Sequence, residues 1–269
     1  MYPLVPIEPD MFFIGVVVLL ALGLFVGMVV LLEVGRRIGL RRMRQDPDTA
    51  REGVGAAEGA VFALLGLLIA FTFSGAAQRF DQRRNLIVEE ANAIGTAYLR
   101  IDLAAPDRQP ALRDSFRRYL AARLDVYEKI PDLAAVEVAM ANANRLQREI
   151  WAQAIAATWT PAAHPSAAVL FLPALNAMID ITTTRTMATR FHPPMVIFVL
   201  LIVLALAAAL LAGHAMAASK TRSWAHVVVF AGALAVSLYV ILEVEYPRLG
   251  LIRVDSFDQA LVDLQDLMK

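Results

Sequence analysis

The sequence contains no cysteine, which excludes disulfide bonds and thiol chemistry. It also has no excess of either charge, because 25 basic and 25 acidic residues give a formal net charge of zero. A neutral chain offers no global electrostatic attraction to nucleic acid, so we expect no nucleic-acid partner. Histidine is scarce, and the four copies show no metal-ligand spacing: His164, His192, His214 and His226.

Catalytic patterns are missing as well. Glu89 and Glu90 are adjacent, so on a helix their side chains point roughly 100° apart and cannot act as a carboxylate pair within one chain. The glycine-rich stretch 53–60, GVGAAEGA, lacks the Lys-Ser/Thr pair of a phosphate-binding loop. We therefore expect no enzyme, no metal and no cofactor.

Long uncharged runs dominate what is present. The chain of 269 residues is 58% hydrophobic, and four runs, 11–32, 59–77, 195–213 and 225–242, are each long enough to cross the ~30 Å core of a bilayer as a helix. No cationic stretch precedes the first run, so we expect no cleaved signal peptide. Gly23 and Gly27 in this run form a GxxxG pair, which permits close helix approach.

Between the second and third runs the chain is polar, and its apolar residues recur at helical spacing, without any β pattern. The predicted fold is all-α: a polytopic membrane protein with four transmembrane helices and a helical extramembrane insertion between the second and third. We expect four parts: 1–77 with the first two membrane helices and an arginine-rich loop, the insertion 78–194, the third and fourth membrane helices 195–243, and a C-terminal tail 244–269. The stretch 256–269 of this tail is acidic and amphipathic.

The second run continues without proline to residue 103, which predicts one helix, half in lipid and half in water. The watery half has two faces. One is a mostly apolar seam that needs a partner helix: Phe80, Arg84, Ile87, Ala91, Ile94, Tyr98 and Ile101. The other is a polar stripe: Ser74, Gln78, Asp81, Asn85, Glu89, Asn92 and Thr96. This stripe fits a hydrated lumen, hydrogen bonds between copies of the chain, or a solvated helix face.

Charged residues near the predicted membrane boundaries form a second group of candidates. We expect structural ion pairs or headgroup contacts from Arg79, Arg83, Arg84, Asp180, Arg185, Glu243, Glu245 and Arg248. The acidic pair after the fourth run either anchors a helix end at the interface or docks against the arginines of the second helix. Asp180 and Arg185 fit a structural salt bridge better than an ion site.

Basic residues predict the topology. Arg36, Arg37, Arg41, Arg42, Arg44 and Arg51 follow the first run, and a turn at 46–48, Asp-Pro-Asp, precedes the second. The positive-inside rule places this loop in the cytoplasm, and Lys220 with Arg222 agrees. Both termini and the insertion then lie outside the cytoplasm, although five arginines that flank the insertion oppose this orientation.

Three stretches, AFTFSGAAQRFDQRRNLIVEEANAIGTAYLR (70–100), LNAMIDITTTR (175–185) and LEVEYPRLGLIRV (242–254), resemble the bestrophin-like domain family of bacterial membrane proteins. The resemblance implies kinship with bestrophins, which are pentameric anion channels with four membrane helices per subunit and an inserted helical domain. The second helix shows no match to the bestrophin neck, and no acidic cluster resembles the calcium clasp of animal members. In bestrophins the inserted domain is cytosolic, the reverse of the orientation predicted here.

The resulting functional hypothesis is an oligomeric, bestrophin-like ion channel in the bacterial inner membrane. Its partners are the lipid bilayer, inorganic ions and further copies of the chain, with a pentamer implied by the resemblance. The expected lining residues are Phe71, Ser74, Gln78, Asn85, Glu89 and Asn92. Rings of Glu89 would favour cations, with constriction by Phe71 or Phe73. The alternative is a non-conducting membrane scaffold or sensor that acts through its helical insertion.

Overall fold

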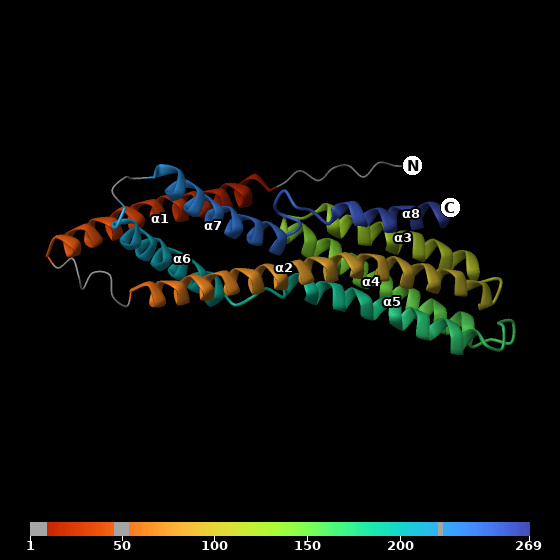
Figure 1. Ribbon diagram of the computed structural model, residues 1–269. Helices are drawn as coiled ribbons and strands as arrows, with labels where there is room; N and C mark the ends of the chain where they lie inside the picture. The colour runs from red at the N-terminus through yellow and green to blue at the C-terminus, as the bar shows by residue number, and fades with distance from the viewer. Residues whose placement is uncertain (1–9, 46–53, 220–222) are drawn as a thin grey trace. The chain divides into compact units, whose positions relative to one another are not determined.

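The computed structural model describes residues 10–45, 54–219 and 223–269. Within these ranges the chain is helical throughout its regular structure and contains no strand, which confirms the all-α prediction. The elements are α1 (Met11–Gln45), α2 (Val54–Leu99), η2 (Arg100–Leu103), α3 (Gln109–Glu128), α4 (Leu133–Thr158), α5 (Ala167–Arg190), α6 (Met195–Met216), α7 (Trp224–Glu245), η3 (Asp255–Asp258) and α8 (Gln259–Leu267) (Figure 1). The N-terminal tail, the turn at 46–48, Arg51, Lys220 and Arg222 lie outside the described residues.

The chain forms two compact units, neither of which is continuous in sequence. The first, here called the membrane unit, consists of residues 11–78 and 192–246. The second, here called the helical unit, contains residues 79–191 and 247–269. Helix α2 contributes its first part to the membrane unit and its second part to the helical unit, and it is continuous through the boundary.

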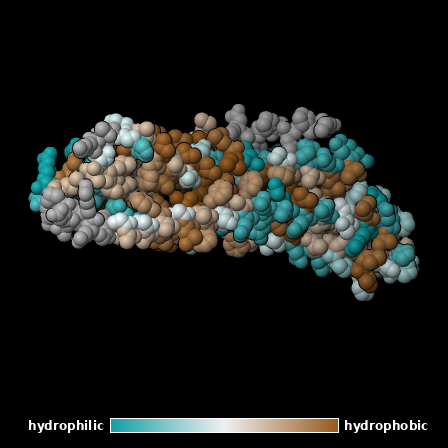
Figure 2. Space-filling view, viewed as in Figure 1, coloured by the Kyte–Doolittle hydropathy of each residue, from teal (hydrophilic) through white to brown (hydrophobic). Residues whose placement is uncertain are grey.

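The membrane unit contains the apolar helices. Among the described residues, four helical segments are long and apolar enough to cross a bilayer: Met11–Gln45, Gly55–Leu103, Ala167–Met216 and Trp224–Glu245. In the third segment the span is α6, because α5 ends at Arg190 and residues 191–194 are not helical. Hydrophobic side chains cover the surface of α1 and α6 broadly (Figure 2). Such a surface is stable only in lipid or against another protein, so the chain is a membrane protein.

Helix α1 extends further than the sequence pattern indicated. The expected loop after Leu32 is helical up to Gln45 and carries five arginines on the helix itself: Arg36, Arg37, Arg41, Arg42 and Arg44. Arginine is a good helix former, and cations near a helix C-terminus interact favourably with its dipole. No proline occurs between Leu32 and Pro47, so the charges end the apolar run and not the helix.

Helix α1 packs against α6 and α7 within this unit, and glycines allow the closest approach. A Cβ atom on Gly35 would lie 1.9 Å from the carbonyl oxygen of Leu210, and one on Gly213 would lie 2.0 Å from that of Leu32. By contrast, a Cβ on Gly23 would meet nothing within 4 Å. A Cβ on Gly27 would lie 3.2 Å from the side chain of Leu206 in α6, so one member of the expected glycine pair lies at this contact, and the tightest backbone approach is at Gly35 and Gly213.

The helical unit buries the seam predicted on α2. Ile87, Ile94 and Ile101 are at most 1% exposed, and Tyr98 is also buried. They pack with the inward rows of α3, α4 and α5, whose largest fully buried members include Leu112, Phe116, Leu120, Leu146, Ile150 and Phe171. The partner that the seam required is thus supplied by the same chain.

The C-terminal segment belongs to this core. Leu261 and Met268 are buried, and Leu264 packs at the rim of the same cluster. The Tyr98 hydroxyl donates to the Met268 carbonyl at 3.2 Å, and a guanidinium nitrogen of Arg117 donates to the same oxygen at 3.4 Å. Residues 247–269 are therefore a packed part of the helical unit.

Candidate functional site

The polar stripe of α2 lies on the surface of the chain. All six expected lining residues are exposed: Phe71, Ser74, Gln78, Asn85, Glu89 and Asn92. Within the helix, the Gln78 amide donates to the Ser74 hydroxyl at 3.5 Å. On the second part of the helix, the buried seam occupies the other face, so α2 presents polar side chains where its own chain does not cover it. The lining role of these residues stays a prediction.

The boundary arginines of α2 have different surroundings. Arg83 is buried and donates from Nε to the Ala188 carbonyl at 3.1 Å and from Nη2 to the Phe191 carbonyl at 2.9 Å. It therefore caps the C-terminal end of α5, where the last carbonyl oxygens have no N–H partner within the helix. Arg84 lies 3.2 Å from the Asp81 carboxylate and over the ring of Phe257, while Arg79 is half-buried.

The acidic pair at the end of α7 is almost completely buried, with Glu243 and Glu245 at most 1% exposed. Glu245 Oε1 lies 2.8 Å from Nδ1 of His192, whose ring stacks on Tyr246 at 4.5 Å between centroids. These contacts tie the end of α7 to the segment that precedes α6. The sequence pattern did not assign His192 to this pair.

A buried ion cluster in the helical unit is the most organised polar feature of the chain. Its centre is Glu90 of α2, which is 0% exposed. Arg123 of α3 donates from Nε to Glu90 Oε1 at 2.5 Å, and Arg185 of α5 donates to Glu90 Oε2. One carboxylate thus joins three helices, and both of its oxygens have a guanidinium partner.

The C-terminal segment completes the cluster. Arg185 donates from its other terminal nitrogen to Asp258 at 2.8 Å, and Arg248 donates to Asp258 and to Asp255 at 2.8–3.1 Å. The sequence analysis considered Arg185 with Asp180, and Arg248 with Glu245. In the structure both arginines bind a different carboxylate, that of Asp258.

Tyr127 of α3 lies in the middle of these arginines. The guanidinium carbons of Arg185, Arg248 and Arg123 lie 3.7, 4.9 and 5.1 Å from its ring centroid, distances at which cations interact with an aromatic face. Its hydroxyl donates to Glu90 Oε2 at 3.0 Å and accepts from Arg123. The ring thus separates three like charges and binds all of them.

Burial and neighbouring charges shift the pKa values of Glu90, Tyr127 and Tyr119. Burial by itself would raise the pKa of Glu90, but Arg123 and Arg185, by charge and hydrogen bonds, hold it below its ordinary value. Burial raises the pKa of the Tyr127 hydroxyl well above its usual range, so this group stays a hydrogen-bond donor to Glu90. Burial raises the pKa of Tyr119 to about 12, and its hydroxyl accepts a hydrogen bond from Gln147 at 3.0 Å.

The cluster has a structural character. Its charges are paired with one another and shielded from solvent, and no group of three or more metal-ligating side chains occurs in the described part of the chain. Sequence reasoning missed Glu90 because it was weighed only against its neighbour Glu89. One signal was available: Glu90 lies three residues after Ile87 and four before Ile94, on the buried seam itself.

Known proteins resemble this chain in sequence and in fold. A family model of the bestrophin-like domain matches residues 22–256. Among solved structures, two single-substitution variants of a bacterial bestrophin homologue from Klebsiella pneumoniae are similar to this chain. The first has a TM-score of 0.62 and 14% sequence identity, and the match covers 89% of this chain and 98% of that one. The second has a TM-score of 0.63 and 13% sequence identity, and the match covers 91% of this chain and 98% of that one. A search of the curated proteins gives no match. At this identity the structural likeness concerns the fold.

Proposed function

The chain belongs to the bestrophin-like domain family, and from this premise we propose that it forms an oligomeric ion channel whose pore is lined by α2. The observation that carries the proposal is the two-sided nature of this helix. Its seam is filled by its own chain, whereas Ser74, Gln78, Asn85, Glu89 and Asn92 are exposed along the other side. Polar side chains in line on a helix that continues out of an apolar run are suited to a hydrated axis shared by several copies.

Selectivity in such a pore would depend on ring charges and constrictions. Glu89 contributes one negative charge per subunit, so a ring of these side chains would favour cations. Phe71 is 66% exposed and Phe73 45% exposed in the uncharged part of α2, where a ring of aromatic side chains would form a hydrophobic constriction. No metal or cofactor has a part in this mechanism.

The test is ion flux through the purified protein in liposomes. We expect Glu89→Gln to lower the cation-to-anion permeability ratio, measured as a shift of the reversal potential under a salt gradient. Glu128→Gln is the matched control, since Glu128 is an exposed carboxylate at the end of α3 and is not part of the stripe on α2. A ratio that changes equally in both variants, or in neither, would reject Glu89 as a lining residue.

We place the chain in the bacterial inner membrane, with the arginine-bearing end of α1 in the cytoplasm. The five arginines between Arg36 and Arg44 support this orientation by the positive-inside rule. The helical unit and both termini then lie outside the cytoplasm. By the family's precedent we propose a homo-pentamer with inorganic ions as its substrates.

A second candidate function is a non-conducting scaffold or sensor. It is favoured by large apolar side chains that the helical unit leaves exposed near the end of α4 and the start of α5: Trp159 at 76% and Val169 at 74%. Exposed apolar groups of this size commonly mark protein–protein contacts. Absence of flux from well-folded oligomers would favour this function over the channel.

A further inference from the structure

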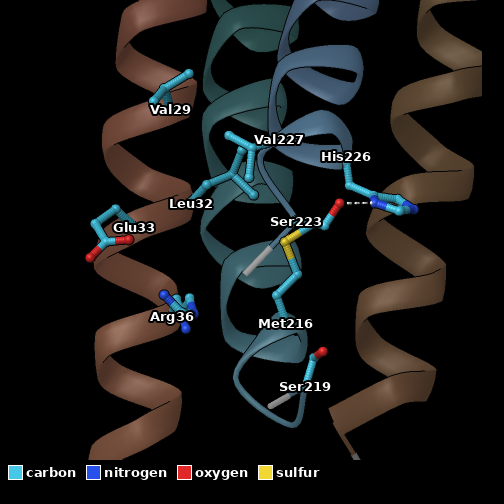
Figure 3. Close-up of a pocket in the computed structure, with 9 residues that line it drawn as sticks. All are labelled: Val29, Leu32, Glu33, Arg36, Met216, Ser219, Ser223, His226 and Val227. Carbon is cyan, nitrogen blue, oxygen red and sulfur yellow. Dashed lines mark hydrogen bonds between the residues drawn. The ribbon is translucent and has the colours of Figure 1, made fainter. Parts of the chain in front are cut away.

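A small cavity lies in the membrane unit among α1, the end of α6 and the start of α7 (Figure 3). Its volume is about 210 Å³. The lining residues come from three helices and the segment between the last two: Val29, Leu32, Glu33, Arg36, Met216, Ser219, Ser223, His226 and Val227. None of them took part in the channel proposal above.

The cavity is apolar at one end and polar at the other. Leu32 and Val227 are buried beside Val29 and form the apolar end, while Arg36 and Ser219 lie at the opposite end (Figure 3). Along α1 this change follows the sequence, because Leu32 closes the uncharged run and Arg36 comes one turn later. The cavity therefore lies at the level where hydrocarbon gives way to lipid headgroups.

The polar end holds one cation, Arg36. Among the described lining residues Glu33 is the one carboxylate; it accepts from Arg37 Nε at 2.8 Å, and in Figure 3 it is directed away from Ser223 and His226. Among the residues that the structure describes, Arg36 has no carboxylate at ion-pair distance. Its guanidinium is thus available to an anion from outside the chain.

The N-terminus of α7 adds donors to this end. Ser223 is the N-cap residue, but its hydroxyl is hydrogen-bonded to Nδ1 of His226 at 2.5 Å and does not cap the backbone (Figure 3). The amide groups of a first helical turn have no acceptor within their own helix, and the helix dipole places partial positive charge there. Backbone donors, a hydroxyl and a guanidinium together are the groups that bind phosphate oxygens.

We propose that this cavity binds the phosphate group of an anionic phospholipid headgroup, with Arg36 as the charged ligand and the acyl chains against Val29 and Leu32. The volume accommodates a headgroup phosphate but not a whole lipid, so the chains extend along the apolar outer surface of α1. A free phosphate ion offers the same oxygens but makes no use of the apolar end. Trp224, 53% exposed at the start of α7, is a residue type typical of this depth.

The test is native mass spectrometry of the purified full chain after equilibration with phosphatidylglycerol, with phosphatidylcholine or with inorganic phosphate. We expect the chain to retain phosphatidylglycerol in preference to phosphatidylcholine. Arg36→Gln should lower this retention about five-fold, as expected for one arginine–lipid charge contact. Arg44→Gln is the control, because Arg44 is an exposed arginine of the same helix that does not line the cavity.

Three results would overturn the proposal. Equal retention of phosphatidylglycerol by the two arginine variants would remove Arg36 from the site. Equal retention of both lipids by the unmodified chain would show that the net negative charge of the headgroup is not recognised. Arg36-dependent binding of inorganic phosphate without lipid selectivity would assign the cavity to a soluble anion. Circular dichroism of both variants checks that loss of binding is not loss of folding.

Discussion

Glu90 and Arg185 are separated by 95 residues in the sequence and form a buried ion pair between α2 and α5. Replacing Glu90 by glutamine would leave Arg123 without its carboxylate partner in the core of the helical unit, and Arg185 with Asp258 alone. Removing one partner of such a pair costs about 3–5 kcal/mol, because the remaining charge is buried uncompensated. We expect a large fall in the thermal unfolding temperature of Glu90→Gln.

The neighbouring glutamate provides the control for this substitution. Glu89 is exposed, so Glu89→Gln should change the free energy of unfolding by no more than about 0.5 kcal/mol. The two variants remove the same carboxylate from adjacent positions. Equal unfolding temperatures would show that the buried cluster contributes little to stability.

Acid should weaken the helical unit through the same residue. The pKa of Glu90 is lower in the folded chain than its ordinary value of 4.5, so the unfolded state takes up a proton first as the pH falls. The stability from this group is present above pH 4.5 and is lost as the pH falls through the lower folded pKa. The difference in unfolding temperature between the unmodified chain and Glu90→Gln should therefore shrink below pH 4.5. A difference that stays constant from pH 7 to pH 3 would contradict this.

The α1–α6 contact should not tolerate an added methyl group. In Gly213→Ala the new Cβ would lie 2.0 Å from the Leu32 carbonyl oxygen, so the two helices must separate. Overpacking of this kind costs about 1–3 kcal/mol. Gly23→Ala meets nothing within 4 Å and should be neutral or stabilising by about 1 kcal/mol, since alanine favours helix. Unfolding temperatures of both variants in detergent give the comparison.

The C-terminal helix should matter for the stability of the helical unit. Leu261 is 0% exposed in its core, and Leu261→Ala should cost about 2–5 kcal/mol of unfolding free energy. Leu267 lies on the same helix but is 81% exposed, and Leu267→Ala should have little effect. Proteolysis within 79–191 would report the loss directly: faster cleavage is expected for the first variant alone.

The absence of cysteine makes the topology directly measurable. A single cysteine at His164, exposed in the segment between α4 and α5, should react with a membrane-impermeant maleimide in intact bacterial spheroplasts. A cysteine at Arg44, exposed near the end of α1, should react only after the membrane is permeabilised. The reverse pattern would place the helical unit in the cytoplasm.

Much of the fold could be predicted from the sequence because its signals are local. Uncharged runs located the apolar helices, and α4 begins after Pro131 and Asp132, whose carboxylate caps the helix. The end of α1 could not be placed this way, since arginines such as Arg36 and Arg44 mark the end of the hydrophobic run but are compatible with helix.

The buried ion cluster could not be predicted from local sequence signals, for a different reason. Arg185 could be recognised as an ion-pair candidate, but its partners Glu90 and Asp258 are distant in the sequence. The amphipathic pattern after residue 255 predicted a helix without indicating which surface it would cover. Only the packing of α8 against α3 and α2 shows that the C-terminal segment belongs to the core of the helical unit.

The discontinuity of the helical unit has a consequence for biosynthesis. The ribosome delivers residues 79–191 first, then α6 and α7, and the segment 247–269 only after them. Until that moment Arg185 lacks Asp258, and the space of Leu261 and Met268 is unfilled. The domain therefore completes its folding only after the last two apolar helices have been synthesised, which couples its maturation to membrane insertion of the whole chain.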